Sequence, residues 1–182
     1  MKVKVSKFLS YLLRHHPERY NLILDNFGYA NLKVVLNILN NRFKNTEIDK
    51  GYIEDLIQTS SKKRFEIFED KIRALYGHSI KEKIHMKISE NLPKILYHGT
   101  TEKAYKSIRK EGLKRKNRQY VHLTEDKETA YKVGKRRTNS PIILEINVES
   151  ASNHSTDFYK SGNMYLADFI SAKFINILEK DE

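Results

Sequence analysis

The sequence contains no cysteine, and this absence excludes several kinds of chemistry at once. Disulfide bonds, thiolate nucleophiles and zinc or iron–sulfur sites with cysteine ligands are ruled out, so any catalysis must use other groups. The seven histidines have no metal-binding spacing, such as a pair four residues apart on a helix, and no pair of carboxylates stands out as an acid and a base. We therefore expect chemistry without a metal.

Long apolar runs and glycine-rich motifs are also missing. No stretch approaches the length of a transmembrane span, and Met1–Ser10 has a lysine at every second or third position, unlike a signal peptide. We therefore expect a cytoplasmic, monomeric protein with no membrane partner. No two of the seven glycines have the spacing of a Rossmann fingerprint or a P-loop, so a dinucleotide, if bound, must be held in another way.

Charge is what the sequence has in excess. There are 34 Lys and Arg against 23 Asp and Glu, a net charge of +11, while 39% of the residues are hydrophobic. The hydrophobic content indicates a folded protein, and the positive field attracts polyanions, so nucleic acid is the first partner to consider. The alternative is a lysine-rich surface that binds no ligand.

The first half has the pattern of three helices followed by a hairpin. Phe8, Leu9, Leu12 and Leu13 predict a helix that ends near His16, before Pro17. Asn31 is the expected cap of a second helix, and a third covers Ile53, Leu56 and Ile57. Two strand-like runs, 64–68 and 71–75, are separated by a turn at Glu69-Asp70 and predict a hairpin. This order is typical of a winged-helix module, a scaffold used mostly for nucleic acid but also for protein contacts.

Basic residues of this half are expected to face solvent. On a helical wheel Arg14 lies almost opposite the apolar face and His15 on its flank, while Arg64 alternates with the apolar Phe65. Arg14 and Arg64 could meet one anion, since guanidinium groups bind phosphate bidentately and keep their charge. The alternative is two unrelated surface arginines.

A polar stretch, Lys81 to Asn91, followed by Pro93 predicts a linker, so we place a domain boundary near residue 90 and expect domains at 1–90 and 91–182. The second domain alternates strand-like runs with two helical stretches, which makes the fold class α+β. The runs are Ile95–His98, Val121–Thr124, Ile142–Val148 and Phe174–Leu178, and the helical stretches lie near Glu102–Lys110 and Glu125–Lys132. Gly112 fits a helix C-cap and Thr124 an N-cap.

Polar residues of this domain could bind a ligand. His98-Gly99-Thr100 follows a predicted strand, where a glycine lets a ligand approach the backbone. His122 lies within a strand and is either a ligand contact or a strand histidine whose hydrogen bonds are satisfied by the fold. Arg136-Arg137, ahead of Pro141, is either functional or a solvated basic loop.

Motifs along nearly the whole chain resemble those of the KptA-type RNA 2′-phosphotransferases. In the first half these are Leu12-Leu13-Arg14-His15 with Pro17, Leu24-Asp25 with Gly28, Lys62 with Arg64-Phe65, and Ile72-Arg73-Ala74 with Gly77-His78-Ser79. In the second half they are Tyr97-His98-Gly99-Thr100, Gly112-Leu113 with Arg118, Val121-His122-Leu123, Val133-Gly134 with Arg136, and Ser161 with Asn163. No single motif is specific, but so many in the same order are hard to obtain by chance.

The resemblance implies an N-terminal winged-helix-like RNA-binding lobe and a C-terminal lobe of the ADP-ribosyltransferase type that binds NAD. The family's active site combines an arginine–histidine pair with two further arginines, matched here by Arg14, His15, Arg64 and Arg136. The NAD pocket is matched by His98, Gly99, Thr100 and His122, with Arg118 and Thr124 as further candidates. Lys62, Ser161 and Asn163 are expected to bind the RNA substrate.

The reaction that the resemblance implies removes an internal RNA 2′-phosphate in two steps, as in tRNA splicing or RNA repair. The 2′-phosphate attacks C1″ of the NAD ribose and nicotinamide leaves. The ribose 2″-hydroxyl then attacks phosphorus, which releases RNA with a 2′-hydroxyl and ADP-ribose 1″,2″-cyclic phosphate. Two alternatives are an ADP-ribosyltransferase that modifies nucleic-acid ends or protein, and a non-catalytic winged-helix protein that binds nucleic acid in a salt-sensitive way.

The sequence departs from the family at several aromatic positions. The family often has glutamine where Tyr76 stands and tryptophan where Tyr29 and Tyr165 stand. Met164 occupies a position where other ADP-ribosyltransferases carry a catalytic glutamate. The lack of that glutamate suits a substrate that brings its own charged nucleophile.

Overall fold

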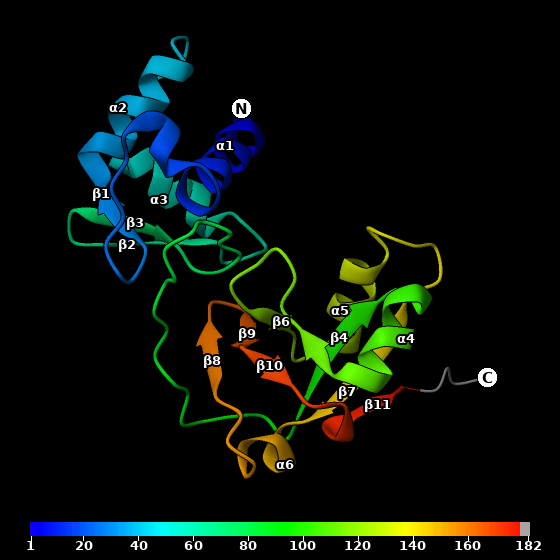
Figure 1. Cartoon of the computed structure of the whole chain (residues 1–182). Coiled ribbons are helices and arrows are strands. Elements are labelled where there is room, and N and C mark those ends of the chain that lie inside the picture. The colour runs from blue at the N-terminus through cyan, green and yellow to red at the C-terminus, as the bar shows by residue number, and fades with distance from the viewer. Residues whose placement is uncertain (179–182) are drawn as a thin grey trace. The chain divides into compact units, whose positions relative to one another are not determined.

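The computed structural model describes residues 1–178 and divides the chain into two compact units (Figure 1). Unit 1 comprises Met1–Met86, and unit 2 continues from Lys87, so the division falls slightly before the boundary predicted near residue 90. Helices and short antiparallel strands occur in both units, which gives the mixed α and β content that the sequence predicts. Within the described residues, no helix is both long enough and apolar enough to span a membrane.

Unit 1 contains three helices and one antiparallel sheet. The helices are α1 (Lys2–Arg14), α2 (Leu32–Arg42) and α3 (Lys50–Gln58), with a 3₁₀ helix at Pro17–Tyr20. The strands β1 (Tyr29–Asn31), β2 (Phe65–Phe68) and β3 (Lys71–Ala74) are ordered β1-β3-β2. The predicted hairpin is confirmed, because Phe65 pairs with Ala74 and Ile67 with Ile72. The predicted Asn31 cap is also confirmed, since its side chain accepts a hydrogen bond from the Val34 N–H.

The apolar stripe of α1 forms part of the core of unit 1. Its residues at helical spacing, Val5, Leu9, Leu12 and Leu13, are completely buried. The helix ends at Arg14, two residues before the predicted end, because the N–H groups of His15 and His16 both bond to the carbonyl of Tyr11. This early end places His15 and His16 in the turn that leads to the 3₁₀ helix.

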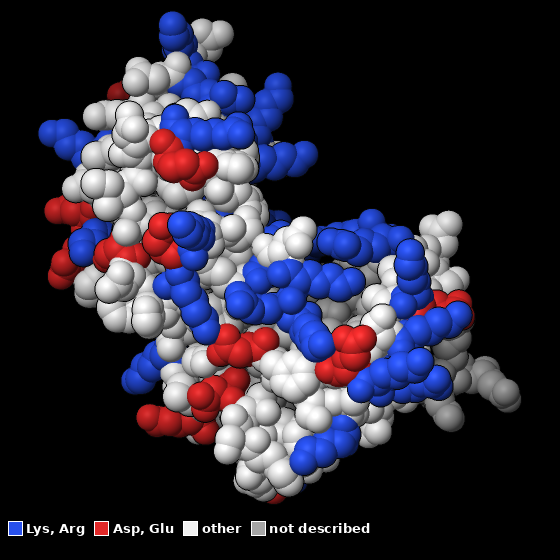
Figure 2. Space-filling view, viewed as in Figure 1, with Lys and Arg blue, Asp and Glu red and all other residues white. Residues whose placement is uncertain are grey.

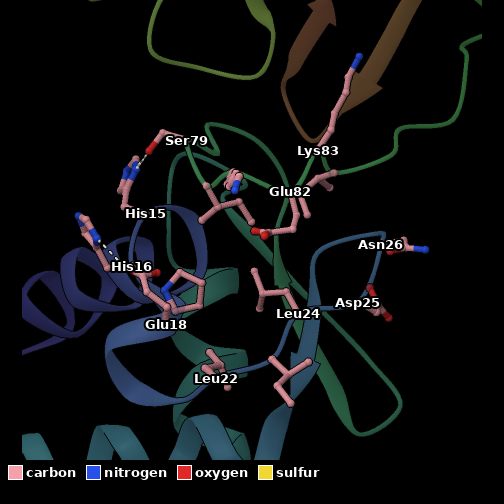
Figure 3. Close-up of a pocket in the computed structure, with 15 residues that line it drawn as sticks. His15, His16, Glu18, Leu22, Leu24, Asp25, Asn26, Ser79, Glu82 and Lys83 are labelled. Atoms are coloured by element: carbon pink, nitrogen blue, oxygen red, sulfur yellow. Dashed lines mark hydrogen bonds and ion pairs between the residues drawn. The ribbon is translucent and has the colours of Figure 1, made fainter.

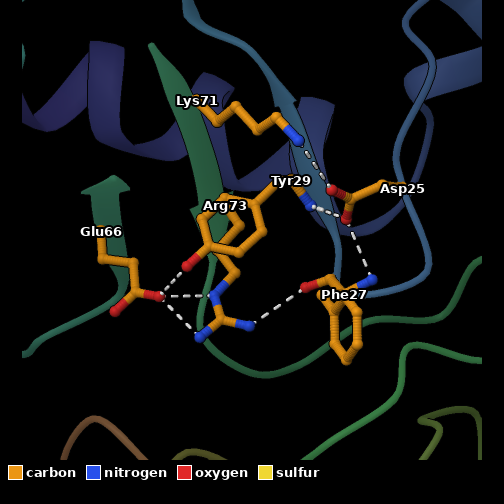
Figure 4. A network of polar contacts seen from close by, with 6 residues as sticks. All are labelled: Asp25, Phe27, Tyr29, Glu66, Lys71 and Arg73. Carbon is orange, nitrogen blue, oxygen red and sulfur yellow. Dashed lines mark hydrogen bonds and ion pairs between the residues drawn. The ribbon is translucent and has the colours of Figure 1, made fainter. Parts of the chain in front are cut away.

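A polar network fixes the outer face of the sheet of unit 1 (Figure 4). Tyr29 Oη and Arg73 Nε both donate to Glu66 Oε1, each at 2.6 Å, and burial together with the Glu66 bond raises the pKa of Tyr29 to about 12. Asp25 accepts from the N–H groups of Phe27 and Tyr29, and Arg73 donates to the Phe27 carbonyl. The turn predicted at 25–28 is therefore present and is tied to the hairpin.

The predicted linker is only partly free of unit 1. Residues 81–91 contain no helix or strand, as expected. Ile84, however, is only 2% exposed, and the His85 N–H donates to the carbonyl of Asn26 at 2.8 Å. A polar composition concealed this contact, because one buried isoleucine is enough to anchor the segment.

Unit 2 has two three-stranded antiparallel sheets. The first, ordered β11-β7-β4, contains β4 (Ile95–Thr100), β7 (Ile142–Asn147) and β11 (Ile175–Ile177). The second, ordered β6-β9-β8, contains β6 (Val121–Leu123), β8 (Phe158–Ser161) and β9 (Met164–Ala167). A bridge between Tyr97 and Thr124 joins β4 to the end of β6. A short pair, β5 (Leu113–Lys114) with β10 (Phe169–Ile170), completes the strands.

The helices of unit 2 are α4 (Glu102–Glu111), α5 (Lys127–Gly134) and α6 (Val148–Ser152). Gly112 is the C-cap of α4 with a φ of 82°, as predicted. The N-cap of α5 is Asp126, which accepts from the Thr129 N–H at 2.6 Å, so the prediction of Thr124 was wrong. Thr124 is still in extended pairing with Tyr97, and its hydroxyl donates to the carbonyl of Asp126.

Gly99 is required for the packing of α5 against β4. A β-carbon at this position would overlap the carbonyl oxygen of Ala130 and approach the Gly134 nitrogen to 3.1 Å. The space on that side of Gly99 is therefore filled by α5, which gives this glycine a packing role. That a ligand also approaches its backbone stays a prediction.

We expect Gly99→Ala to destabilise unit 2 by about 2–3 kcal/mol, because overpacking against backbone cannot be relieved by rotating a side chain. Urea unfolding of the full chain measures this change. Gly51→Ala is the matched control, since a β-carbon there meets only Asp49 at ordinary contact distance and alanine favours a helix. Equal stability of the Gly99 variant and the unaltered protein would contradict this packing role.

Candidate active-site residues in the two units

Arg14 is the centre of a first group of candidates, in unit 1. It is only 9% exposed, so the prediction that it points outward was wrong. Its Cζ lies 5.6 Å from the centroid of the Phe65 ring and 4.9 Å from that of Tyr76, and Nη2 donates to the Arg64 carbonyl at 3.4 Å. The helical wheel of α1 alone could not show that β2 and the segment after β3 cover this side of the helix. The Arg14 guanidinium therefore makes cation–π contacts with two aromatic rings.

His15 is held beside Arg14 by Ser79. His15 Nδ1 lies 2.8 Å from Ser79 Oγ, and the Ser79 N–H donates to the Arg14 carbonyl at 2.9 Å. Both ends of this contact are seen in Figure 3, where His15 borders a hollow of about 560 Å³ in unit 1. Leu22, Leu24 and Ile84 give the hollow an apolar part, and Glu18, Glu82 and Lys83 give it a charged part. Ser79 is part of a motif in the sequence, but no role was predicted for it.

Arg64 and Lys62 are arranged by a second serine that sequence reasoning missed. Arg64 Nη1 donates to Ser60 Oγ at 2.9 Å, and Ser60 Oγ donates to the Lys62 carbonyl at 3.0 Å. The Arg64 carbonyl accepts from Arg14 and also from the Leu75 N–H. Arg14, His15, Arg64 and the backbone of Lys62 are thus brought together within unit 1.

His98 and His122 are the centre of a second group, in unit 2. His98 Nδ1 lies 2.9 Å from the His122 carbonyl, and His122 Nδ1 lies 3.0 Å from the Tyr120 carbonyl. A carbonyl oxygen only accepts, so in each ring Nδ1 carries the proton and Nε2 of a neutral ring is an acceptor. Burial lowers the pKa of His98, which outweighs the opposite effect of the His122 bond. A neutral ring of this kind can accept a hydrogen bond from a ribose hydroxyl.

The other polar candidates of unit 2 lie at strand ends near this pair. Thr100 ends β4, Thr124 follows β6, and Ser161 ends β8; all three are buried. Ser161 pairs with Met164 and Leu123 with Tyr165, so the Gly162-Asn163 turn lies at the same end of its sheet as Thr124. Gly162 has a φ of 61°, as a two-residue hairpin turn requires, and Asn163 is exposed there.

Arginines near the ends of α5 and β6 form a positive surface of unit 2. Arg136 is exposed in the turn after α5, two residues beyond Gly134, which packs against Gly99. Arg118 is exposed, and partial desolvation together with the nearby charge of Arg137 lowers the pKa of Arg118. Like charges held close together favour an anionic ligand, which would relieve their repulsion. Arg137 was part of a predicted basic loop, but it was not chosen as a site residue.

The sequence is similar to those of known proteins along nearly its whole length. Residues 1–167 match the model of the family described as RNA 2′-phosphotransferase, Tpt1 / KptA family. The chain belongs to this family. A probable RNA 2′-phosphotransferase of Acetivibrio thermocellus is 42% identical over 173 residues, 94% of either chain. One from Fusobacterium nucleatum is 43% identical over 177 residues, 95% of this chain and 97% of the relative, and one from Archaeoglobus fulgidus is 36% identical over 178 residues, 98% and 81%.

The structure gives a physical account of three aromatic departures from the usual Tpt1/KptA pattern. Tyr76 stacks on the Arg14 guanidinium, so a cation–π contact is made at a position where the family often has an amide. The Tyr29 hydroxyl donates to Glu66 and the Tyr165 hydroxyl donates to Glu125, each at 2.6 Å. A tryptophan at either position could make such a hydrogen bond through its ring nitrogen only with a different geometry. Met164 begins β9 opposite Ser161.

In this Tpt1/KptA protein we expect the stability of unit 2 to fall below about pH 6.5, the ordinary pKa of histidine. His98 has a lowered pKa in the folded unit, so below about pH 6.5 the unfolded chain binds a proton more readily than the folded unit does. The free energy of unfolding should therefore be unaffected above that pH and should decrease as the pH falls below it. Hydrogen exchange of β4 and β6 at about pH 7.5 and about pH 5.5 measures it. In His98→Gln most of the pH-dependent loss of stability should disappear, whereas in the control His154→Gln, at an exposed histidine, it should remain. An unchanged loss of stability in His98→Gln would show that His98 is not its cause.

Proposed function

We propose that this member of the Tpt1/KptA family is an NAD-dependent RNA 2′-phosphotransferase. The observation that carries the proposal is the state of Arg14: a buried guanidinium in cation–π contact with Phe65 and Tyr76, beside a histidine fixed by Ser79. A guanidinium suits an RNA phosphate because it keeps its charge and binds oxyanions bidentately. We assign RNA phosphate binding to unit 1, with its winged-helix-like order of elements, and NAD binding to unit 2 as an ADP-ribosyltransferase-like lobe.

The polar groups of unit 2 suit the parts of NAD. The His98 imidazole, whose pKa is lowered by burial, offers an acceptor nitrogen for a ribose hydroxyl, and the Arg118–Arg137 pair offers positive charge for a diphosphate. His122 supports the His98 ring through its backbone carbonyl. Neither group needs a glycine-rich loop, so the lack of a Rossmann fingerprint is consistent with NAD as co-substrate. Thr100, Thr124 and Gly99 are assigned to the walls of this site, while Ser161, Asn163 and Lys62 are assigned to the RNA.

The chemistry needs positioning and charge stabilisation rather than a protein nucleophile. In the first step an oxygen of the RNA 2′-phosphate bonds to C1″, and nicotinamide leaves with the electron pair of the glycosidic bond. In the second step the 2″-hydroxyl oxygen bonds to phosphorus, its proton is lost, and the RNA 2′-oxygen leaves and is protonated. We assign the seating of the phosphate to Arg14 and His15, and stabilisation of the second step to Arg64 and Arg136.

The proposal is tested by incubating the protein with a 2′-phosphorylated oligonucleotide, with and without NAD. We expect loss of the 2′-phosphate and release of nicotinamide in equal amounts, and only when NAD is present. Nicotinamide release with RNA that stays modified would instead indicate an ADP-ribosyltransferase that stops after the first step. RNA binding without NAD consumption would indicate a non-catalytic binding protein, and either outcome would overturn the proposal.

A further inference from the structure

One side of α1 carries basic side chains that the core does not use. Lys4, Lys7, Tyr11 and His15 follow the spacing i, i+3, i+7, i+11, which places them along one side of the helix. Lys4 and Lys7 are exposed, and neither has an acidic partner within the part of the chain that the structure describes. Their charges are therefore available to a ligand.

Two arginines from other segments extend the same side. Arg19 Nη1 donates to Tyr11 Oη at 2.9 Å, and Arg42 at the end of α2 lies 4.5 Å from the centroid of the Phe8 ring. Both arginines are exposed. The nearby Glu18 accepts from His16 at 3.0 Å, and that bond lowers the pKa of Glu18. We call the surface made by Lys4, Lys7, Arg19 and Arg42 the α1 track.

The α1 track leads toward the phosphate-binding residues of unit 1. Ten residues of helix separate Lys4 from Arg14, a distance of about 15 Å along the axis, so the track is longer than a single phosphate group. In Figure 2, Lys and Arg side chains gather over the side of unit 1 where α1 and the end of α2 lie, whereas acidic side chains gather toward the β2–β3 turn. The positive charge is thus concentrated on one side of the unit.

We propose that the α1 track binds the phosphate backbone of single-stranded RNA that flanks the phosphorylated nucleotide. Cations repeated along a helix, with the half-buried ring of Tyr11 between them, suit a repeating polyanion that carries bases able to stack. A membrane surface fits less well, because the apolar face of α1 is buried in the core and cannot insert into lipid. This inference rests on the proposed function, since it takes Arg14 and His15 as the seat of the reacting phosphate.

The test compares Lys4→Gln/Lys7→Gln with Lys103→Gln/Lys110→Gln, a control pair on α4 that removes the same charge from exposed positions of unit 2. Glutamine and lysine have similar helix propensity, so both variants should fold. Binding of a 2′-phosphorylated oligonucleotide without NAD is measured over a range of salt. Loss of two phosphate contacts should reduce the slope of log K against log salt concentration, the salt slope, by about 1.4. The factor by which the α1 variant binds more weakly than the unaltered protein should therefore be about sevenfold smaller at about 200 mM than at about 50 mM salt.

The outcomes separate this inference from the proposed function. Turnover of a 2′-phosphorylated dinucleotide, which is too short to reach the α1 track, should be unchanged in the α1 variant. Three results would overturn the α1 track as an RNA surface. They are an unchanged salt slope in the α1 variant, an equal loss of RNA affinity in the control pair, and binding of a polyglutamate peptide as tight as that of RNA. Failure of phosphate removal by the unaltered protein, with the slope change present, would overturn the proposed function and leave the track standing as an RNA-binding surface.

Discussion

Arg64→Ala is expected to accumulate ADP-ribosylated RNA. In the second step negative charge grows on the oxygens of phosphorus, and removal of one positioned donor from such a site typically slows the step by about 10²–10³-fold. Arg64 is suited to this task because Ser60 holds Nη1 at 2.9 Å while its backbone carbonyl supports Arg14. The first step, whose phosphate is seated by Arg14 and His15, should slow by less than about tenfold.

The intermediate is measured by denaturing electrophoresis and mass spectrometry of RNA quenched at successive times. Lys63→Ala is the matched control, since Lys63 is the exposed neighbour of Arg64 and also removes one positive charge. The control should convert substrate to product without a lasting intermediate. If Arg64→Ala leaves only unreacted substrate, the division of the two steps between these arginines is wrong.

Arg14→Lys is expected to abolish nearly all activity while the protein stays folded. Lysine keeps the positive charge but lacks a planar guanidinium that can contact the Phe65 and Tyr76 rings and present two N–H groups to one phosphate. We expect kcat/KM for the 2′-phosphorylated RNA to fall by about 10²–10³-fold, as for loss of a pre-organised donor. Hydrogen exchange of α1 and β2 should change little, because the aliphatic part of the side chain still fills the space.

Arg109→Lys provides the comparison for this change, since Arg109 is exposed on α4 and belongs neither to the Arg14 group nor to the α1 track. It should keep kcat/KM for a 2′-phosphorylated dinucleotide within about twofold, as expected for a surface substitution. Retention of activity by Arg14→Lys would show that charge alone is sufficient and that the stacked geometry has no role. Loss of exchange protection in α1 and β2 would instead identify Arg14 as a structural residue.

Regular patterns in the sequence predicted the elements of unit 1 well. The apolar spacing of α1 and α2, the Asn31 cap and the 65–74 hairpin are local signals, and the structure contains all of them. β1, β8, β9 and the β5–β10 pair were missed, although β2, β3, β6 and β11 are no longer than four residues and were predicted. The Thr124 cap was wrong because Asp126 two residues later caps α5 while Thr124 continues strand pairing.

The candidate site was predicted in its residue types more than in its geometry. A helical wheel places Arg14 by one helix alone, whereas its burial depends on Phe65 and Tyr76, which are distant in sequence. Ser60 and Ser79 act through single hydroxyl bonds across turns, and no spacing rule marks such serines. The packing role of Gly99 could not be predicted from the sequence, since only the position of α5 shows what a β-carbon would meet.

The fate of the 2′-phosphate is the most direct test of the account. A radiolabelled RNA 2′-phosphate is incubated with the protein and NAD, and the labelled products are separated. We predict that the label leaves the RNA and appears in ADP-ribose 1″,2″-cyclic phosphate, in the same amount as nicotinamide. Release of the label as inorganic phosphate, or retention of all the label on RNA, would contradict the account.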